Sequence, residues 1–248
     1  MRTRLILALL AIVVFAQSCS GKSLEQSIRG FEVFLPSELI TAAEAADVDL
    51  ASEIDDALGR IESSLDPEPV MIAFKVGRMV IPQAGLVGFT DPSSGDVDMT
   101  VDPDTSIGLK QSLTHWLPAQ LAHELHHSKR VRGGPGYGRT LRHALVSEGL
   151  ADAYASEVYP DVKAPWTDAI SVEQERDAWS RARPLLNQSY DLEDHARWFF
   201  GAGDLPNWTG YTLGFRTAKR YLEANQGVTA AEAFAAAAAD VSAFGGSS

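Results

Sequence analysis

The pattern of hydrophobic and polar residues divides the chain into an apolar leader, a region of mixed periodicity and a helical remainder. Within residues 49–64 the apolar positions recur at helical spacing and predict an amphipathic helix. Four short apolar runs follow, bounded by proline- and glycine-rich turns, and predict a small sheet of three or four strands. These runs lie at residues 70–74, 79–81, 85–90 and 97–101. From Gln111 onward the pattern is mainly helical, so the predicted fold class is α+β with a small mixed or antiparallel sheet.

The leader, residues 1–18, has the pattern of a secretory signal peptide. Arg2 and Arg4 precede an apolar run that is too short to span a bilayer comfortably. The residues around Cys19 resemble a bacterial lipobox, in which the cysteine is lipidated and becomes the first mature residue. We therefore expect a membrane-anchored lipoprotein outside the cytoplasm. The alternative is cleavage after Ala16 and secretion without a lipid.

Composition and charge narrow the possible partners of the mature chain. The 248 residues contain one cysteine, so no internal disulfide can form, and the net charge is −12. An acidic surface argues against nucleic acid as the main partner, because phosphate binding needs clustered Lys and Arg. We expect a polar tether over residues 19–35 and a single domain over residues 36–248.

Three of the six histidines fall within Gln120–Arg130. Pro118 suits the first turn of a helix through this stretch. On such a helix His123 and His127, four residues apart, share one face and can bind one ion. Glu124 is adjacent to His123 and can reach a water molecule at the same ion. This H-E-x-x-H pattern predicts a zinc-protease helix, although a surface helix without a metal remains the alternative.

A third metal ligand is expected from the stretch L-V-S-E-G-L-A-D, which ends at Asp152. Catalytic zinc sites usually have three protein ligands and one open position. Glu148 lies far enough beyond His127 for one loop and a returning helix. Asp152 is one helical turn after Glu148 and can accept the ring N–H of a ligating histidine. Small and apolar neighbours indicate that both carboxylates are buried.

Taken together, these residues resemble the gluzincin pattern of thermolysin-like metallopeptidases. The sequence H-E-L-H-H followed by L-V-S-E-G-L-A-D is similar to that of a family of predicted zinc-dependent proteases, several of them bacterial lipoproteins. The resemblance implies a zinc ion, a zincin-like fold and an edge strand beside the metal-binding helix. Residues 85–101 are candidates for that strand. Two imidazoles and one carboxylate suit zinc, with manganese, cobalt or iron as alternatives.

The predicted chemistry is hydrolysis of a peptide bond by a water that zinc activates and Glu124 deprotonates. Glu124 would then pass the proton to the leaving nitrogen. A further donor should stabilise the developing oxyanion. We choose Tyr211 for this role, while a helical apolar stripe around it favours simple packing. The other candidate donors are Tyr154, His195 and Arg216.

The sequence therefore predicts a zinc peptidase that acts on a peptide or protein substrate. The alternative is a catalytically silent zinc-binding lipoprotein that serves as a binding or assembly factor. A protein that only binds zinc has no need for a carboxylate at Glu124, so this residue favours the enzyme. A lipoprotein without any metal would require the whole histidine and carboxylate pattern to arise by chance.

Overall fold

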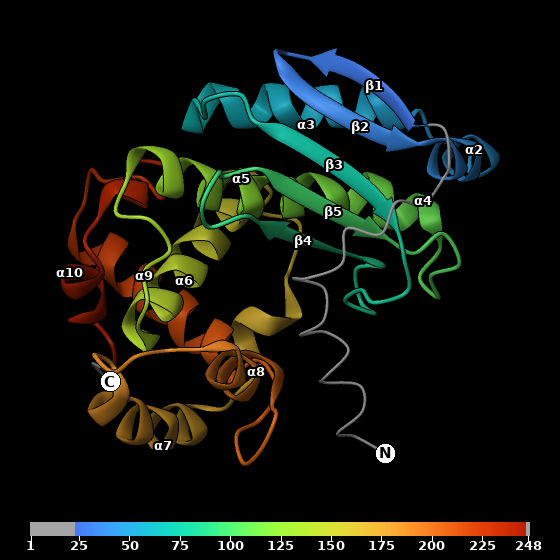
Figure 1. The fold of residues 1–248 in the computed structure, drawn as a ribbon. Helices are drawn as coiled ribbons and strands as arrows, with labels where there is room; N and C mark the ends of the chain where they lie inside the picture. Colours follow the sequence, from blue (N-terminus) through green and yellow to red (C-terminus); the bar gives the residue numbers. More distant parts are fainter. Residues whose placement is uncertain (1–22, 247–248) are drawn as a thin grey trace. The chain divides into compact units, whose positions relative to one another are not determined.

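The computed structural model describes residues 23–246 and shows the α+β fold that the sequence predicts (Figure 1). The described residues group into two compact units, the first made of 23–133 and 154–162 and the second of 134–153 and 163–246. The sequence predicts a single domain over residues 36–248, and the described residues of both units lie in this range except for residues 23–35. The predicted signal peptide and Cys19 lie outside the described residues.

The first unit contains a five-stranded mixed sheet with strand order β1-β2-β3-β5-β4. Its strands are β1 (Ser23–Ile28), β2 (Phe31–Pro36), β3 (Met71–Val76), β4 (Leu86–Thr90) and β5 (Val97–Val101). β2, β3 and β5 run parallel, while β1 and β4 pair antiparallel with their neighbours. β4 is thus an edge strand, and it lies in the range from which the sequence predicts one.

Residues 23–35 form strands where the sequence predicts a tether. Phe31, Val33 and Leu35 alternate along β2 and are at most 2% exposed, so this strand is part of the core. Arg29 and Gly30 both have positive φ and make the two-residue turn that joins β1 to β2. A predicted strand further along is also absent, because residue 81 makes only an isolated bridge with Leu86.

The helices of the first unit pack beside this sheet. They are α2 (Ser37–Ala45), α3 (Leu50–Leu65), α4 (Leu109–Gln111), the π-helical turn η2 (Ser112–Trp116) and α5 (Leu117–Gly133). The helix predicted for residues 49–64 is confirmed as α3. Asp49 caps it by accepting a hydrogen bond from the backbone N–H of Ser52 at 3.1 Å. In Figure 1, α3 and α5 lie next to each other behind the sheet.

Helix α5 carries the H-E-x-x-H residues and is a core helix. All residues from Leu117 to Ser128 are buried, and the helix packs against α3 and β4. Pro118 lies in its first turn, as predicted, immediately after η2. Proline has no N–H to donate to the preceding turn, and the chain forms a wider π-helical turn directly before this helix. The burial of α5 does not fit a plain surface helix.

The second unit is helical. Its elements are α6 (Leu141–Val158, the last turn of which belongs to the first unit), η3 (Pro165–Asp168), α7 (Val172–Ala182), η4 (Arg183–Leu185), α8 (Leu192–Phe200), α9 (Thr209–Ala224), η5 (Glu232–Ala235) and α10 (Ala238–Ser242). α9 packs against η3, α7, α8 and α10. The core of this unit includes Trp179, Trp198, Phe199 and Leu213.

Helices α6 and α9 approach each other backbone to backbone. A Cβ atom at Gly149 would lie 2.1 Å from the carbonyl oxygen of Gly214. A Cβ atom at Gly214 would lie 2.3 Å from the carbonyl oxygen of Leu145. Only glycine fits at either position. The close crossing therefore fixes the position of α6 around residue 149 within the second unit.

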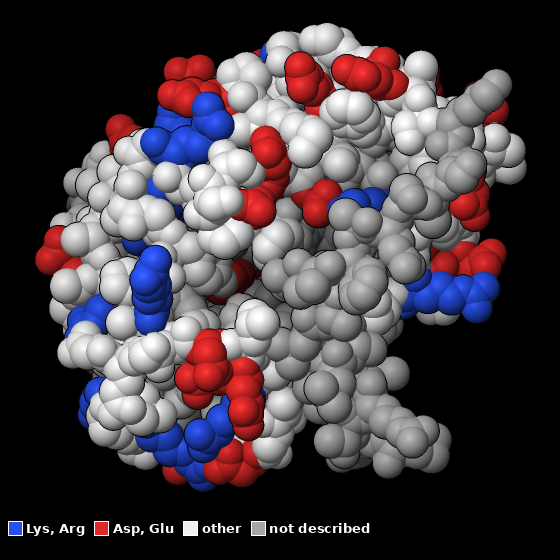
Figure 2. Space-filling view, in the orientation of Figure 1, with Lys and Arg blue, Asp and Glu red and all other residues white. Residues whose placement is uncertain are grey.

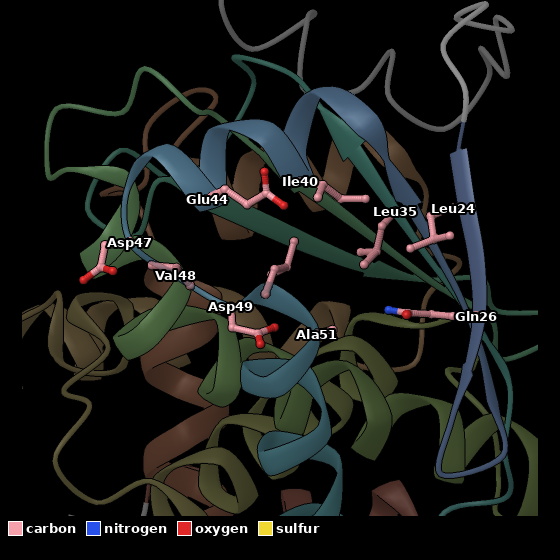
Figure 3. A pocket seen from close by; sticks show the side chains of 10 residues that line it. Leu24, Gln26, Leu35, Ile40, Glu44, Asp47, Val48, Asp49 and Ala51 are labelled. Atoms are coloured by element: carbon pink, nitrogen blue, oxygen red, sulfur yellow. The ribbon is translucent and has the colours of Figure 1, made fainter.

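The visible surface is mixed in charge. Figure 2 shows acidic side chains spread over this face with basic side chains between them. Among residues 23–246, no helix has both the length and the hydrophobicity needed to cross a bilayer. A cavity of about 430 Å³ lies in the first unit, lined by residues of β1, β2, α2 and α3, and none of the predicted site residues lines it (Figure 3).

Candidate metal site

His123 and His127 lie on adjacent turns of α5, and their rings face each other. The two residues are only 6% and 3% exposed. The Nε2 atoms are 3.1 Å apart, and the ring planes meet at 78°. Two nitrogen ligands at tetrahedral positions around zinc lie about 3.3 Å apart, given a Zn–N distance of about 2.0–2.1 Å. The histidine pair therefore already has the separation that one bound cation requires.

Glu124 is held by hydrogen bonds on both carboxylate oxygens. Gln120, one turn earlier on α5, donates its amide N–H to Oε1 at 3.2 Å. The hydroxyl of Thr90, at the end of β4, lies 2.8 Å from Oε2. A Cβ atom at Gly88, also on β4, would lie only 2.4 Å from the Glu124 Cγ. The edge strand thus provides both a hydrogen-bond donor and the space for this carboxylate.

Glu148 lies on α6 in the second unit and is 6% exposed. The hydroxyl of Tyr137, from the loop before α6, donates a hydrogen bond to its Oε1. Burial, and next the nearby charge of Glu148, raise the pKa of Tyr137 well above its ordinary value. The phenol is therefore protonated and acts as a donor at neutral pH.

Asp152 is also buried, at 4% exposure. Its Oδ1 accepts a hydrogen bond from the indole N–H of Trp166 at 3.0 Å. This contact holds the carboxylate on α6 and satisfies part of its hydrogen-bonding capacity. The predicted role of Asp152 as an acceptor for a ligating histidine stays a prediction.

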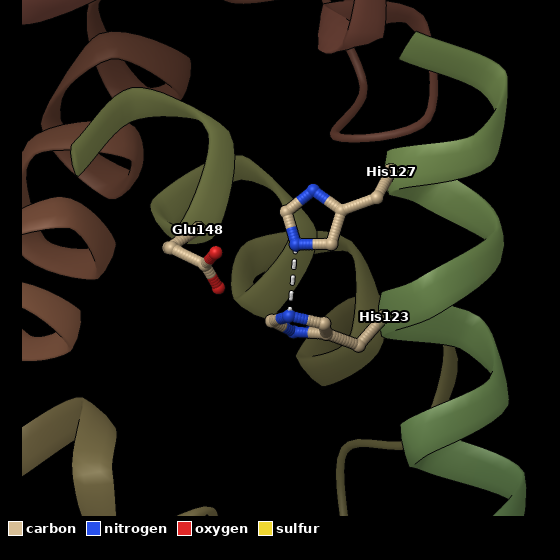
Figure 4. Close-up of side chains that lie close together, drawn as sticks. All are labelled: His123, His127 and Glu148. Atoms are coloured by element: carbon tan, nitrogen blue, oxygen red, sulfur yellow. Dashed lines mark hydrogen bonds between the residues drawn. The ribbon is translucent and has the colours of Figure 1, made fainter. Parts of the chain in front are cut away.

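One donor atom from each of His123, His127 and Glu148 lies within 4.8 Å of the other two. Figure 4 shows the two imidazoles and the carboxylate pointing toward one another. The set comprises two nitrogen donors and one oxygen donor, all buried, which matches the ligands of catalytic zinc sites in type and number. The residues present therefore fit a divalent metal such as zinc.

The four candidates for an oxyanion donor differ in their contacts. The Tyr211 ring packs edge-on against Phe199 with a centroid distance of 4.8 Å, and its catalytic role stays a prediction. Arg216 forms ion pairs with Glu175 and Asp168. These ion pairs occupy guanidinium N–H groups of Arg216 and lower its value as an oxyanion donor.

The other two candidates also have hydrogen-bond partners. The Tyr154 hydroxyl lies 2.8 Å from the Ser64 hydroxyl. His195, which the sequence treats as an isolated histidine, has its Nδ1 2.7 Å from the Tyr190 hydroxyl. Its ring also stacks on Phe199 with a centroid distance of 4.6 Å.

Sequence reasoning missed three residues that contact the site carboxylates. Gln120 precedes Glu124 by four residues, a spacing that predicts a contact on a helix, so it could have been recognised. Thr90 and Tyr137 reach Glu124 and Glu148 only through the packing of a strand and a loop. No local pattern in the sequence indicates those two contacts.

The fold is of the α+β, zincin-like class, and the helix with the H-E-x-x-H sequence packs against the edge strand β4. The chain belongs to the family described as "Predicted Zn-dependent protease (DUF2268)", whose model matches residues 48–243. The match covers α3, the sheet from β3 onward and both helices that carry the site residues. A comparison with curated protein sequences gave no match.

Among solved structures, the chain is similar to an aminopeptidase N family protein from Idiomarina loihiensis. The two share 14% sequence identity and superpose with a TM-score of 0.51 over 91% of this chain. At this identity the likeness shows the fold alone. The aligned region spans 41% of the other protein, so the chain corresponds to less than half of that larger protein.

Proposed function

We propose that the chain is a zinc-dependent peptidase in which His123, His127 and Glu148 bind the metal and Glu124 is the general base. The observation that supports this most strongly is the convergence of the three donor atoms within 4.8 Å. A neutral imidazole pair and one carboxylate leave a zinc ion with a net positive charge. Bound in this way, zinc would polarise a carbonyl and make water more acidic.

Glu124 is suited to move the proton in this reaction. Its carboxylate has about four acceptor positions, and the hydrogen bonds from Gln120 and Thr90 occupy two of them. The others can accept a proton from water and later return it to the leaving nitrogen. The two donors also restrict rotation of the carboxylate, so the base is held in one orientation before substrate arrives.

The edge strand β4 supports a peptide as the substrate class. Within the described residues β4 pairs with β5 on one side and is the last strand of the sheet. An extended peptide can add to such an edge through main-chain hydrogen bonds. Because Thr90 at the end of β4 contacts Glu124, a peptide on this edge would lie near the general base.

The experiment is a comparison of Glu124→Gln with wild type in zinc content and in cleavage of casein or a broad peptide library. We expect wild type to carry about one zinc and to cleave, since its three ligands match a catalytic site. Glu124→Gln should keep the zinc and lose about 10²- to 10⁴-fold in cleavage rate, the usual contribution of a general base. His123→Ala should lose the zinc as well.

Glu223→Gln is the matched control, because it makes the same change at an exposed position on α9. It should leave both zinc content and cleavage unchanged. Equal cleavage by Glu124→Gln and wild type would contradict the proposal. Wild-type protein that binds zinc but cleaves nothing in the library would instead favour the silent zinc-binding alternative.

We further propose that the mature protein is a lipoprotein anchored outside the cytoplasm through Cys19. The support is the basic and apolar pattern of residues 1–18 followed by the single cysteine. Mass spectrometry of the mature N-terminus should find an acylated Cys19. An unmodified terminus beginning at Gln17 would show secretion without an anchor.

A further inference from the structure

We propose that Tyr137 is a further residue of the metal site, which positions the Glu148 carboxylate by a hydrogen bond to one of its oxygens. This inference rests on the proposed zinc-binding role of Glu148. Tyr137 lies ten residues after His127 and eleven before Glu148, outside both motif helices, and nothing in the metal-ligand pattern requires a tyrosine there.

The contact itself is specific. The Tyr137 hydroxyl donates to Oε1 of Glu148, and the ring packs against the hydrophobic core of the second unit. A carboxylate at the end of a glutamate side chain can rotate about its terminal bonds. A donor on Oε1 restricts that rotation, so the carboxylate would be held in one orientation toward a metal. Tyr137 would thus hold Glu148 ready to bind.

The loop that carries Tyr137 has a glycine on each side of the tyrosine, and the backbone after it passes close to α6. Gly136 and Gly138 both have positive φ, which a residue with a side chain rarely adopts. A Cβ atom at Gly138 would lie 2.2 Å from Cγ of His143, so the backbone passes directly over that ring. The loop backbone therefore lies against the first turn of α6 directly after the tyrosine.

Residues 189–190 of the same unit form hydrogen bonds with the end of this loop. The backbone N–H of Tyr190 donates to the carbonyl of Arg139 at 3.1 Å, and Thr140 forms a bridge with Ser189. The Thr140 hydroxyl also lies 2.6 Å from Nδ1 of His143 at the start of α6. These contacts join the loop to α6, the helix that carries Glu148. The segment that carries Tyr137 is thus connected to the helix that carries Glu148 by hydrogen bonds as well as by the chain.

Groups that hydrogen-bond to metal ligands typically change metal affinity by about 10- to 100-fold when they are removed. Tyr137→Phe removes only the hydroxyl and keeps the ring in the core. We therefore expect its dissociation constant for zinc, measured by competition with a chromophoric chelator on the full chain, to rise about 10- to 100-fold. Absorption spectra of the cobalt-substituted protein should also change, because the Glu148 oxygens become free to rotate.

Tyr154→Phe is the matched control. It removes a buried hydroxyl from the same helix as Glu148, but this hydroxyl bonds to Ser64. Thermal unfolding in the presence of chelator should show similar losses of stability in both variants. Zinc affinity and the cobalt spectrum should change only in Tyr137→Phe.

The outcomes separate this inference from the proposed function. Wild-type zinc binding together with an equal or tighter dissociation constant in Tyr137→Phe would overturn the role of Tyr137 alone. Equal losses of zinc affinity in Tyr137→Phe and Tyr154→Phe would also overturn it, because the effect would then be one of general stability. Wild-type protein that binds no zinc would overturn the proposed function and this inference with it.

Discussion

Gly88 shows how closely Glu124, the proposed general base, is fitted to the edge strand. The space that a methyl group would need at this position is filled by the Glu124 side chain, 2.4 Å from the ideal Cβ position. Thr90, two residues further along β4, contacts the same carboxylate. The position of Glu124 is therefore set by a strand as much as by its own helix.

We predict that Gly88→Ala lowers the cleavage rate by about 100-fold while zinc content stays at the wild-type level. The added methyl group must push the Glu124 carboxylate aside, and a displacement of about 1 Å at a reacting group can cost about 10²-fold in rate. The measurement is kcat on a peptide substrate, with metal analysis of the same sample. A kcat equal to that of wild type would show that β4 does not constrain the base.

At the scale of single residues, the sequence predicted the groups whose spacing is local. His123, Glu124 and His127 share a helix, so their relation follows from 3.6 residues per turn. Tyr137 and Thr90 belong to a loop and a strand whose direction depends on pairing with distant segments, at Tyr190 and β5. Such contacts have no periodic signal, which explains why they were not predicted.

Helix α6 carries Glu148, and its position within the second unit depends on the crossing with α9. Gly149, immediately after Glu148, contacts the backbone of Gly214 without any side chain between them. A buried crossing of this kind tolerates no added volume, because interiors are close-packed. The close crossing of α6 and α9 thus explains why a glycine follows Glu148, the proposed third ligand.

Gly149→Ala should destabilise the protein by at least about 1–3 kcal/mol, the usual cost of forcing extra volume into a packed core. It should also weaken zinc binding, because α6 must shift at the residue next to Glu148. Thermal unfolding with and without zinc would measure both effects.

Gly59→Ala provides the control for this change. Gly59 lies on α3, and its added methyl group would meet only the far end of the Arg29 side chain. Alanine is favoured over glycine in a helix by about 1 kcal/mol, so this variant should be as stable as wild type or more so. Wild-type stability in Gly149→Ala would mean that α6 and α9 do not meet as the structure shows.

At the scale of elements, strongly periodic segments were predicted well and weakly patterned ones were not. The helix α3 followed from its apolar spacing, and the structure adds the cap at Asp49. β1 was missed because it is an edge strand with mostly exposed side chains, held by backbone hydrogen bonds to β2 that the sequence does not display. The tether predicted for this region therefore corresponds to a hairpin from Ser23 onward.

At the scale of the whole molecule, the chain is acidic overall, and the histidines of the proposed site are buried. The net charge is −12, and acidic and basic side chains are interspersed on the face in Figure 2. The family match over residues 48–243 includes β4, α5 and α6, the three elements that carry the proposed site.

The α+β class could be predicted from the order of periodic segments alone. The order of strands in the sheet could not, because it depends on long-range pairing.

The central claim is that one metal ion binds to His123, His127 and Glu148. Anomalous diffraction at the zinc edge from crystals of the zinc-loaded chain tests it most directly. We predict one strong peak within about 2.0–2.2 Å of the two imidazole Nε2 atoms and one Glu148 oxygen, as expected for zinc ligands. A zinc peak bound by other residues, or Glu148 turned away from an ion held by the two histidines alone, would contradict the account.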